Sequence, residues 1–125
     1  MLFIQLGSFF MNIEDARIYC LGKPCATEDF PFDETTLVFR VENRIFAITD
    51  LENTKWFCVK CDADYAIELR EKYPHIVPAW HMNKRYWNQL DIAALSDELF
   101  FSLVDHSYVE VIKKLPLKTR IKYGM

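Results

Sequence analysis

Three apolar segments joined by short polar connections occupy the middle of the chain and constrain its fold more than any other feature. They are residues 36–41, 44–49 and 55–60. Within the first, Leu37, Phe39 and Val41 recur at every second position, which is typical of a strand buried on one face. Glu42-Asn43 is a plausible tight turn, because Asn tolerates a positive φ. Consecutive strands on short connections usually pair, so the sequence predicts an antiparallel meander.

Predicted helices flank the meander, and capping residues mark where they begin. The first covers residues 13–21, after the N-cap residue Asn12, and Gly22 ends it. The second covers about residues 63–73, after the N-cap residue Asp62.

The remaining elements are less regular. Residues 28–34 indicate a short edge strand or an extended loop, and residues 85–92 indicate a last strand. Ser96 begins a long helical pattern over 97–115. Residues 107–110 read Ser-Tyr-Val-Glu, the pattern of a capping box, which predicts that two helices meet there.

This order of elements predicts an α+β fold: an antiparallel sheet of about five strands with helices packed on one face. At 125 residues the chain is expected to form one domain. We place that domain at residues 11–120, with a C-terminal tail at 121–125. The apolar residues 1–10 lack the basic start of a signal peptide and are too short to cross a bilayer. They are interpreted as an N-terminal extension, from an early start codon or as an arm that docks on the domain.

Charge is unevenly distributed along the chain. The formal net charge is −3, which weighs against non-specific binding to nucleic acid. Residues 1–64 hold 6 Lys/Arg and 11 Asp/Glu, whereas the last fifteen residues contain five Lys/Arg and no Asp or Glu. These cations are Lys113, Lys114, Lys118, Arg120 and Lys122. A basic patch is therefore compatible with an acidic protein.

Four cysteines raise the question of a metal site. Cys58 and Cys61 have C-x-x-C spacing, and with Cys20 and Cys25 they could supply four thiolates to zinc. Positions 58 and 61 fall at a strand end, where residues three apart point to opposite faces. Neither pair has the glycine of a zinc knuckle. We therefore expect reduced, packed thiols in a cytoplasmic protein, without metal or cofactor.

No catalytic motif is evident. Only three glycines are present, which excludes a Walker loop and a dinucleotide fingerprint. His75, His81 and His106 are the only bases of their kind, and no Gly-x-Ser-x-Gly elbow occurs. A pair of His81 with Cys58 or Cys61 stays open. We expect that the protein is not an enzyme.

The candidate site is the stretch from residue 78 to residue 88, Pro-Ala-Trp-His-Met-Asn-Lys-Arg-Tyr-Trp-Asn. It combines aromatic planes, hydrogen-bonding groups and cations, and no acid lies between Glu71 and Asp91. A structural interpretation places its tryptophans in the core. A functional one uses it to bind phosphates, bases or a partner protein. The candidate binding residues are Trp80, His81, Asn83, Lys84 and Arg85 with Lys113, Lys114, Lys118 and Arg120.

The same stretch resembles a known family. His81-Met82-Asn83-Lys84 followed by Trp87-Asn88 is similar to the signature of the MmcQ/YjbR family of small bacterial proteins. Further matching segments occur in order along about residues 11–120. They are Asn12-Ile13-Glu14, Lys23-Pro24, Arg44-Ile45-Phe46-Ala47, Lys60-Cys61-Asp62, Asp105-His106-Ser107-Tyr108 and Leu115-Pro116. Tyr86 stands where many members have His, which weakens any paired-histidine metal site.

The resemblance implies a CyaY-like α+β fold and the label of a DNA-binding protein, and it implies no catalytic residues. The first functional hypothesis is thus DNA binding through a basic and aromatic surface. The alternative is a module that binds a protein or a small ligand without catalysis. No membrane association is expected, and the oligomeric state stays open.

Overall fold

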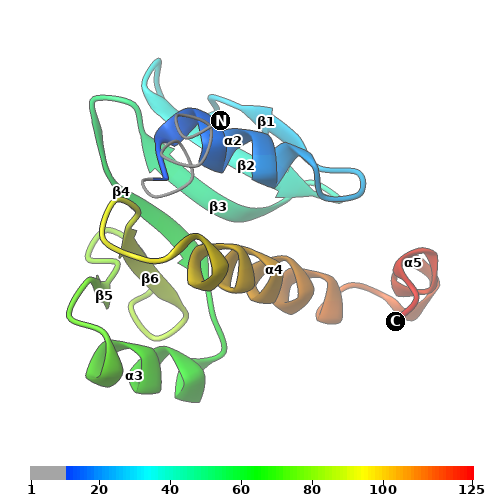
Figure 1. Cartoon of the computed structure of the whole chain (residues 1–125). Helices are drawn as coiled ribbons and strands as arrows, with labels where there is room; N and C mark the ends of the chain where they lie inside the picture. Colours follow the sequence, from blue (N-terminus) through cyan, green and yellow to red (C-terminus); the bar gives the residue numbers. More distant parts are fainter. Residues whose placement is uncertain (1–10) are drawn as a thin grey trace, which may run out of the picture.

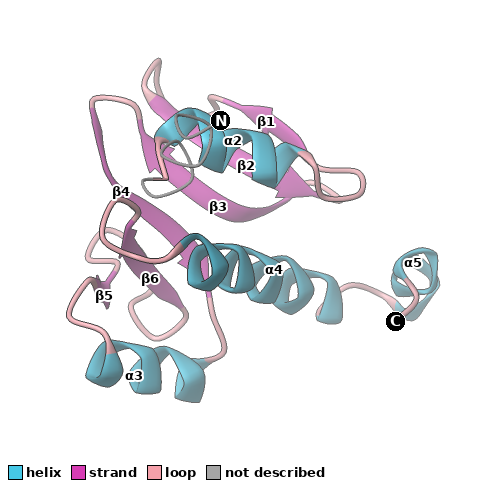
Figure 2. Cartoon of the chain, in the orientation of Figure 1, coloured by secondary structure: helices cyan, strands magenta, loops and turns pink. Residues whose placement is uncertain are grey.

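The computed structural model describes residues 11–125 and has a six-stranded antiparallel sheet at its centre (Figures 1 and 2). The strand order is β1-β2-β3-β4-β6-β5. The strands are β1 (Thr27–Asp29), β2 (Thr36–Val41), β3 (Arg44–Asp50), β4 (Asn53–Lys60), β5 (Ile76–Pro78) and β6 (Trp87–Asp91). The predicted extension at residues 1–10 lies outside the described residues.

The predicted meander is confirmed as strands β2, β3 and β4. The turn between β2 and β3 has φ of 50° at Glu42 and 65° at Asn43, as a two-residue hairpin turn requires. The sheet gains one strand over the expected number because β5 pairs with β6, from Ile76 opposite Leu90 to Pro78 opposite Asn88. A proline is accommodated there because β5 is an edge strand.

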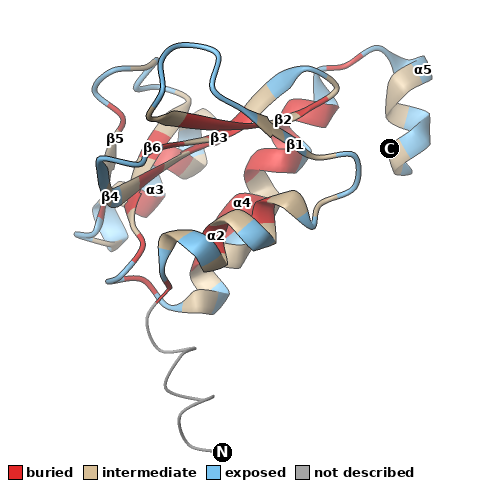
Figure 3. Ribbon diagram, turned by 90° about the horizontal axis from the view of Figure 1, so that it is seen from above, coloured by how far each residue is buried: buried red, intermediate tan, exposed pale blue. Residues whose placement is uncertain are grey.

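Three helices share one core with one face of the sheet. They are α2 (Ile13–Leu21), α3 (Ala63–Lys72) and α4 (Asp97–Lys113). Asn12, Asp62 and Ser96 cap them, each accepting a hydrogen bond from the backbone N–H three residues later. Figure 3 shows α2 and α4 on the same side of the sheet. Helices on one face of an antiparallel sheet confirm the predicted α+β class.

Aromatic residues fill the space between sheet and helices. Phe39, Phe46, Phe57 and Phe100 are fully buried, and their rings pack in tilted and edge-to-face pairs. A bulge shifts the β2–β3 register after Phe39 and directs two consecutive residues of β3, Phe46 and Ala47, into the core. The main core cluster therefore lies between the sheet and the helices.

The predicted break near residue 107 is wrong, because α4 runs unbroken from Asp97 to Lys113. The Ser107 hydroxyl does not cap a helix. It donates to the carbonyl of Phe46 at 2.5 Å and accepts from the backbone N–H of Lys60 at 2.9 Å. These two groups lie on β3 and β4 just beyond their last residue pair, Ala47 with Val59. Ser107 thus joins the helix to the sheet where the strands separate.

The C-terminal segment folds back toward the β2–β3 turn. It contains α5 (Leu117–Arg120) and a 3-10 turn, η1 (Ile121–Tyr123). The Tyr123 hydroxyl donates to Glu42 at 2.5 Å, and Lys122 forms an ion pair with the same carboxylate at 3.1 Å. Among the helices of residues 11–125, none has the length and apolarity needed to cross a bilayer.

Candidate functional site

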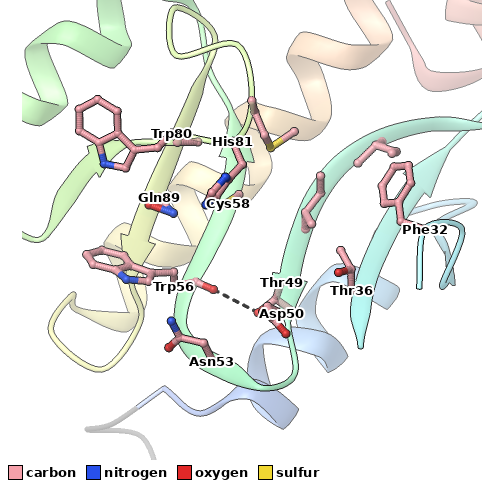
Figure 4. Close-up of a pocket in the computed structure, with 14 residues that line it drawn as sticks. Phe32, Thr36, Thr49, Asp50, Asn53, Trp56, Cys58, Trp80, His81 and Gln89 are labelled. Carbon is pink, nitrogen blue, oxygen red and sulfur yellow. Dashed lines mark hydrogen bonds between the residues drawn. The ribbon is translucent and has the colours of Figure 1, made fainter. Parts of the chain in front are cut away.

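The sheet face opposite the helices carries a cleft of about 650 Å³ (Figure 4). A row of side chains crosses this face through paired positions of four strands: Ile48, Cys58, Gln89 and Val77. The bulge in β3 brings Ile45 to the same face as Ile48, so the cleft floor is broad. The neighbouring residues in β4 and β6, Phe57 and Leu90, point into the core.

Two tryptophans and a phenylalanine stand around this cleft. Trp56 comes from β4, Trp80 from the loop after β5, and Phe32 from the loop before β2. Trp80 is 60% exposed and Phe32 is 66% exposed. Figure 4 shows the two indoles on the same side of the cleft with the Gln89 side chain between them. Aromatic surface left open to solvent in this way is available for a partner.

The loop after β5 is shaped by short-range hydrogen bonds. Met82 N–H donates to the Ala79 carbonyl at 3.1 Å, and the Asn83 side-chain oxygen accepts from Arg85 N–H at 3.1 Å. Asn83 thus forms an Asx turn, a common use of asparagine in loops. Its amide holds the loop, while Trp80 and His81 reach the cleft.

Polar groups in the cleft have free hydrogen-bonding capacity. The Gln89 amide makes no side-chain hydrogen bond within residues 11–125, and the same holds for the His81 imidazole. Asp50 accepts from the backbone N–H of Glu52 through one oxygen. The Lys84 ammonium lies 4.7 Å from the Trp80 ring centroid. The site therefore offers aromatic planes with several hydrogen-bonding groups at their edges.

His81 and Cys58 line the same cleft, which bears on the possible catalytic pair. No hydrogen bond joins them in the part of the chain that the structure describes. Burial raises the pKa of the Cys58 thiol to about 11, so the reactive thiolate is disfavoured at neutral pH. In this geometry Cys58 acts as an apolar part of the cleft floor.

The predicted cations have different surroundings. The Lys84 ammonium lies over the Trp80 ring, whereas Arg85 and Lys114 both approach the Tyr86 ring, at 5.5 and 5.9 Å from its centroid. Lys113 forms an ion pair with Glu110 at 2.8 Å. Of the two cations on α5, Lys118 is exposed, whereas Arg120 is half-buried with its Nε atom enclosed. Trp87 opens β6 and is half-buried.

The four cysteines lie in different environments. Cys20 and Cys61 are buried, Cys58 is half-buried and Cys25 is exposed, and all four are free thiols. Within residues 11–125, no group of three or more His, Cys, Asp or Glu side chains is placed to hold a metal ion. Burial raises the pKa of Cys61 to about 12.

Sequence reasoning missed Trp56, Gln89 and Phe32 as parts of the site. A signal was available for Trp56, because it alternates with the core residues Phe57 and Val59 and so must face the other side of β4. Gln89 could be assigned only after the pairing of β4 with β6 was known. Phe32 lies in a loop, where the sequence gives no direction for a side chain.

Fold and cleft together define a small α+β domain with one sheet face closed by helices and the other open. Comparison with known proteins places this domain in a family. The YjbR family model matches residues 21–110, and the chain belongs to the YjbR family.

Relatives and solved structures agree with this assignment. The chain is 30% identical to YjbR of Escherichia coli K12 over 112 residues, which cover 88% of this chain and 95% of that protein. It is 27% identical to YbdF of Escherichia coli O157:H7 over 104 residues, 82% of this chain and 85% of that protein. The crystal structure of Deinococcus radiodurans protein DR2400, with a DUF419 domain, superposes with a TM-score of 0.85 at 32% identity, covering 94% and 91% of the two chains. A Pseudomonas syringae protein has a TM-score of 0.65 at 25% identity, covering 78% of this chain and 96% of its own.

Proposed function

We propose that this YjbR-family protein is a non-catalytic binding module that takes a small molecule with a flat aromatic ring into the cleft on the open sheet face. One observation carries the proposal: the Trp56 and Trp80 indoles flank a Gln89 amide that has no partner in the described chain. A ring lying against an indole would place its polar edge within reach of this amide.

The size and lining of the cleft support a small ligand. Ligand pockets usually have volumes of about 300–1,000 Å³, mostly apolar walls and a few polar groups that orient the ligand. The cleft of about 650 Å³ has apolar walls from Ile45, Ile48 and Met82 and polar groups from Gln89 and His81. Stacking of a flat ring on an aromatic side chain contributes about 1–3 kcal/mol.

The proposal is tested by nuclear magnetic resonance with flat probes. Adenosine and indole are titrated into the protein while the indole N–H resonances of its three tryptophans are followed, with cyclohexanol as a non-planar control. We expect the Trp56 and Trp80 resonances to shift as a flat probe is added and to reach a plateau. The resonance of Trp87, which lies outside the cleft, should not move. Equal shifts of all three, or no difference between flat and non-planar probes, would contradict it.

DNA binding through a basic and aromatic surface is a second candidate function. The observation that favours it is the Lys84 ammonium beside the exposed Trp80 ring, since single-stranded nucleic acid is bound by cations next to stacking planes. The test is a titration with single-stranded and duplex DNA at two salt concentrations. Phosphate contacts predict an affinity that falls steeply with salt, and absence of binding at about 50 mM salt rejects this candidate.

A further inference from the structure

We propose that Arg44, Lys60, Arg85 and Lys114 form a phosphate-binding site around Tyr86, at the point where β3 and β4 separate. The site is distinct from the cleft: the described residues that line the cleft include none of these four cations. The ligand chemistry is a phosphate group, from a phosphorylated small molecule or from a nucleic-acid backbone.

Backbone geometry brings three of the four cations, Arg44, Lys60 and Lys114, near one another. Ser107 bonds to Phe46, two residues after Arg44, and to the backbone of Lys60 itself. Lys114 follows Ser107 by seven residues, two helical turns, and so continues the same face of the helix. This face runs along the gap between β3 and β4.

Tyr86 completes the arrangement from the other side. The Cys61 N–H donates to the Tyr86 carbonyl at 2.7 Å, which fixes Tyr86 beside the end of β4. The Arg85 guanidinium lies 5.5 Å and the Lys114 ammonium 5.9 Å from the centre of its ring. Two cations that are 29 positions apart in the sequence therefore meet at one aromatic ring.

These cations are not neutralised by neighbouring acids. Among residues 11–125, none of the four forms an ion pair. The nearby carboxylate of Glu110 is buried and already pairs with Lys113, and that of Asp62 caps α3. The excess positive charge affects the pKa of Lys60. Burial lowers this pKa most, repulsion from Lys114 and Arg44 lowers it further, and attraction to Glu110 only partly opposes the shift.

A phosphate group fits this environment better than a halide ion, because its several oxygens can meet more than one cation and suit the planar fork of an arginine. A phosphomonoester or inorganic phosphate carries about 1.5–2 negative charges at neutral pH, and a nucleic-acid phosphodiester carries one. The half-buried position of Lys60 also reduces screening by solvent. A bound phosphate would relieve the repulsion that the folded chain otherwise retains.

The test is a titration of the full chain with inorganic phosphate at constant ionic strength, followed through the lysine side-chain carbon resonances. We expect a saturable response at Lys60 and Lys114. Lys114→Met and Lys60→Met should each weaken phosphate binding about tenfold, the size of one charged hydrogen bond. Because Lys60 is half-buried, Lys114→Met, at an exposed position, keeps the test valid if Lys60→Met fails to fold.

Lys72→Met is the matched control. The Lys72 ammonium lies over the Tyr73 ring at 5.4 Å, a contact similar to that of Lys114 with Tyr86, but it belongs to α3 and to a different aromatic ring. This variant should bind phosphate as the parent does. An equal loss in all three variants, or a response that does not saturate, would overturn the site.

The ionisation of Lys60 gives an independent readout. Phosphate should raise the pKa of Lys60, since a nearby anion favours the charged form. Lys114→Met should raise it without phosphate, because one repelling charge is removed. A pKa of Lys60 that phosphate leaves unchanged would reject direct contact.

Two further arms distinguish the source of the phosphate. Tighter binding of ribose 5-phosphate than of inorganic phosphate, with oligonucleotide affinity unchanged in Lys114→Met, supports a phosphorylated small molecule. The slope of the logarithm of oligonucleotide affinity against the logarithm of salt concentration is the second measurement. If Lys114→Met reduces this slope by about one, the result supports a nucleic-acid backbone. Trp80→Ala should leave phosphate binding intact. The phosphate site is therefore tested independently of ligand binding in the cleft.

Discussion

The two faces of the sheet are built from the same strands but differ in burial and in the residues that they carry. On the helix-covered face, Phe39, Phe57 and Leu90 are fully buried in one continuous core. On the open face, Trp56 and Gln89 alternate with these residues and line a cleft. Alternation along a strand lets one sequence serve stability and binding at once. We infer that side chains on the helix-covered face contribute most of the stability of the fold, whereas side chains on the open face form the candidate binding site.

Phe57 and Trp56 test this comparison most strongly, because they are consecutive residues on opposite faces. Phe57→Ala should lower the free energy of unfolding by about 3–5 kcal/mol, since it leaves a cavity among Phe39 and Phe100. Trp56→Ala should lower it by less than about 1 kcal/mol. Urea unfolding followed by circular dichroism measures both. Equal losses would show that the open face is also part of the stable core.

Ser107 should give the next largest effect, because it connects the helix to the sheet. Ser107→Ala removes the partner of a buried Phe46 carbonyl and of the Lys60 N–H, and should destabilise the chain by about 1–3 kcal/mol. Ser102→Ala, on an exposed position of the same helix, is the matched control and should change stability little. If both variants behave alike, the bridge to the sheet contributes nothing.

The free energy of unfolding should depend on pH through His106, which lies on α4. Its Nε2 atom accepts from the Asp62 N–H at 3.1 Å, and burial lowers its pKa from the ordinary value of 6.5, against the opposite effects of Glu110 and Asp62. The folded state therefore binds this proton less readily than the unfolded state. The contribution of His106 is present above about pH 6.5 and is lost as the pH falls toward the folded pKa.

Unfolding at about pH 7.5 and about pH 5.5 measures this effect, which should be smaller than that of Ser107→Ala. His106→Gln should flatten the pH dependence, while His75→Gln, at an exposed position, should leave it unchanged. A profile that His106→Gln does not alter would assign the dependence to other groups.

The sequence predicted those parts of the fold that depend on local interactions. The strands of the meander, the Glu42-Asn43 turn and the three N-caps are set by neighbours within a few residues. The break predicted in α4 failed because the Ser107 hydroxyl finds partners 61 and 47 residues away. Strand β5 was missed since three residues ending in proline become a strand only by pairing with β6.

The site divides in the same way. Trp80 and His81 were predicted from the composition of one short stretch, and both reach the cleft. Asn83 was predicted as a binding residue from the same stretch; its side-chain oxygen accepts from the Arg85 N–H within the loop, and its part in binding stays a prediction. Trp56, Gln89 and Phe32 join the cleft from other elements, and only the three-dimensional arrangement of strands and loops brings them there. Tertiary pairing thus decides which side chains share a surface.

Gln89→Leu should have the smallest effect on stability and the clearest effect on binding. The row across the open face is otherwise apolar, through Ile48, Cys58 and Val77, so leucine should leave the free energy of unfolding unchanged within about 0.5 kcal/mol or raise it. The response of the Trp80 resonance to adenosine should weaken, because the amide would no longer meet the polar edge of the ring. Binding of indole, which offers fewer polar groups to that amide, should weaken less.

A marked loss of stability in Gln89→Leu would mean that Gln89 contributes to the stability of the fold. A gain in stability together with loss of adenosine binding would mean that the open face keeps a polar group the fold does not need, as expected of a site retained for a ligand.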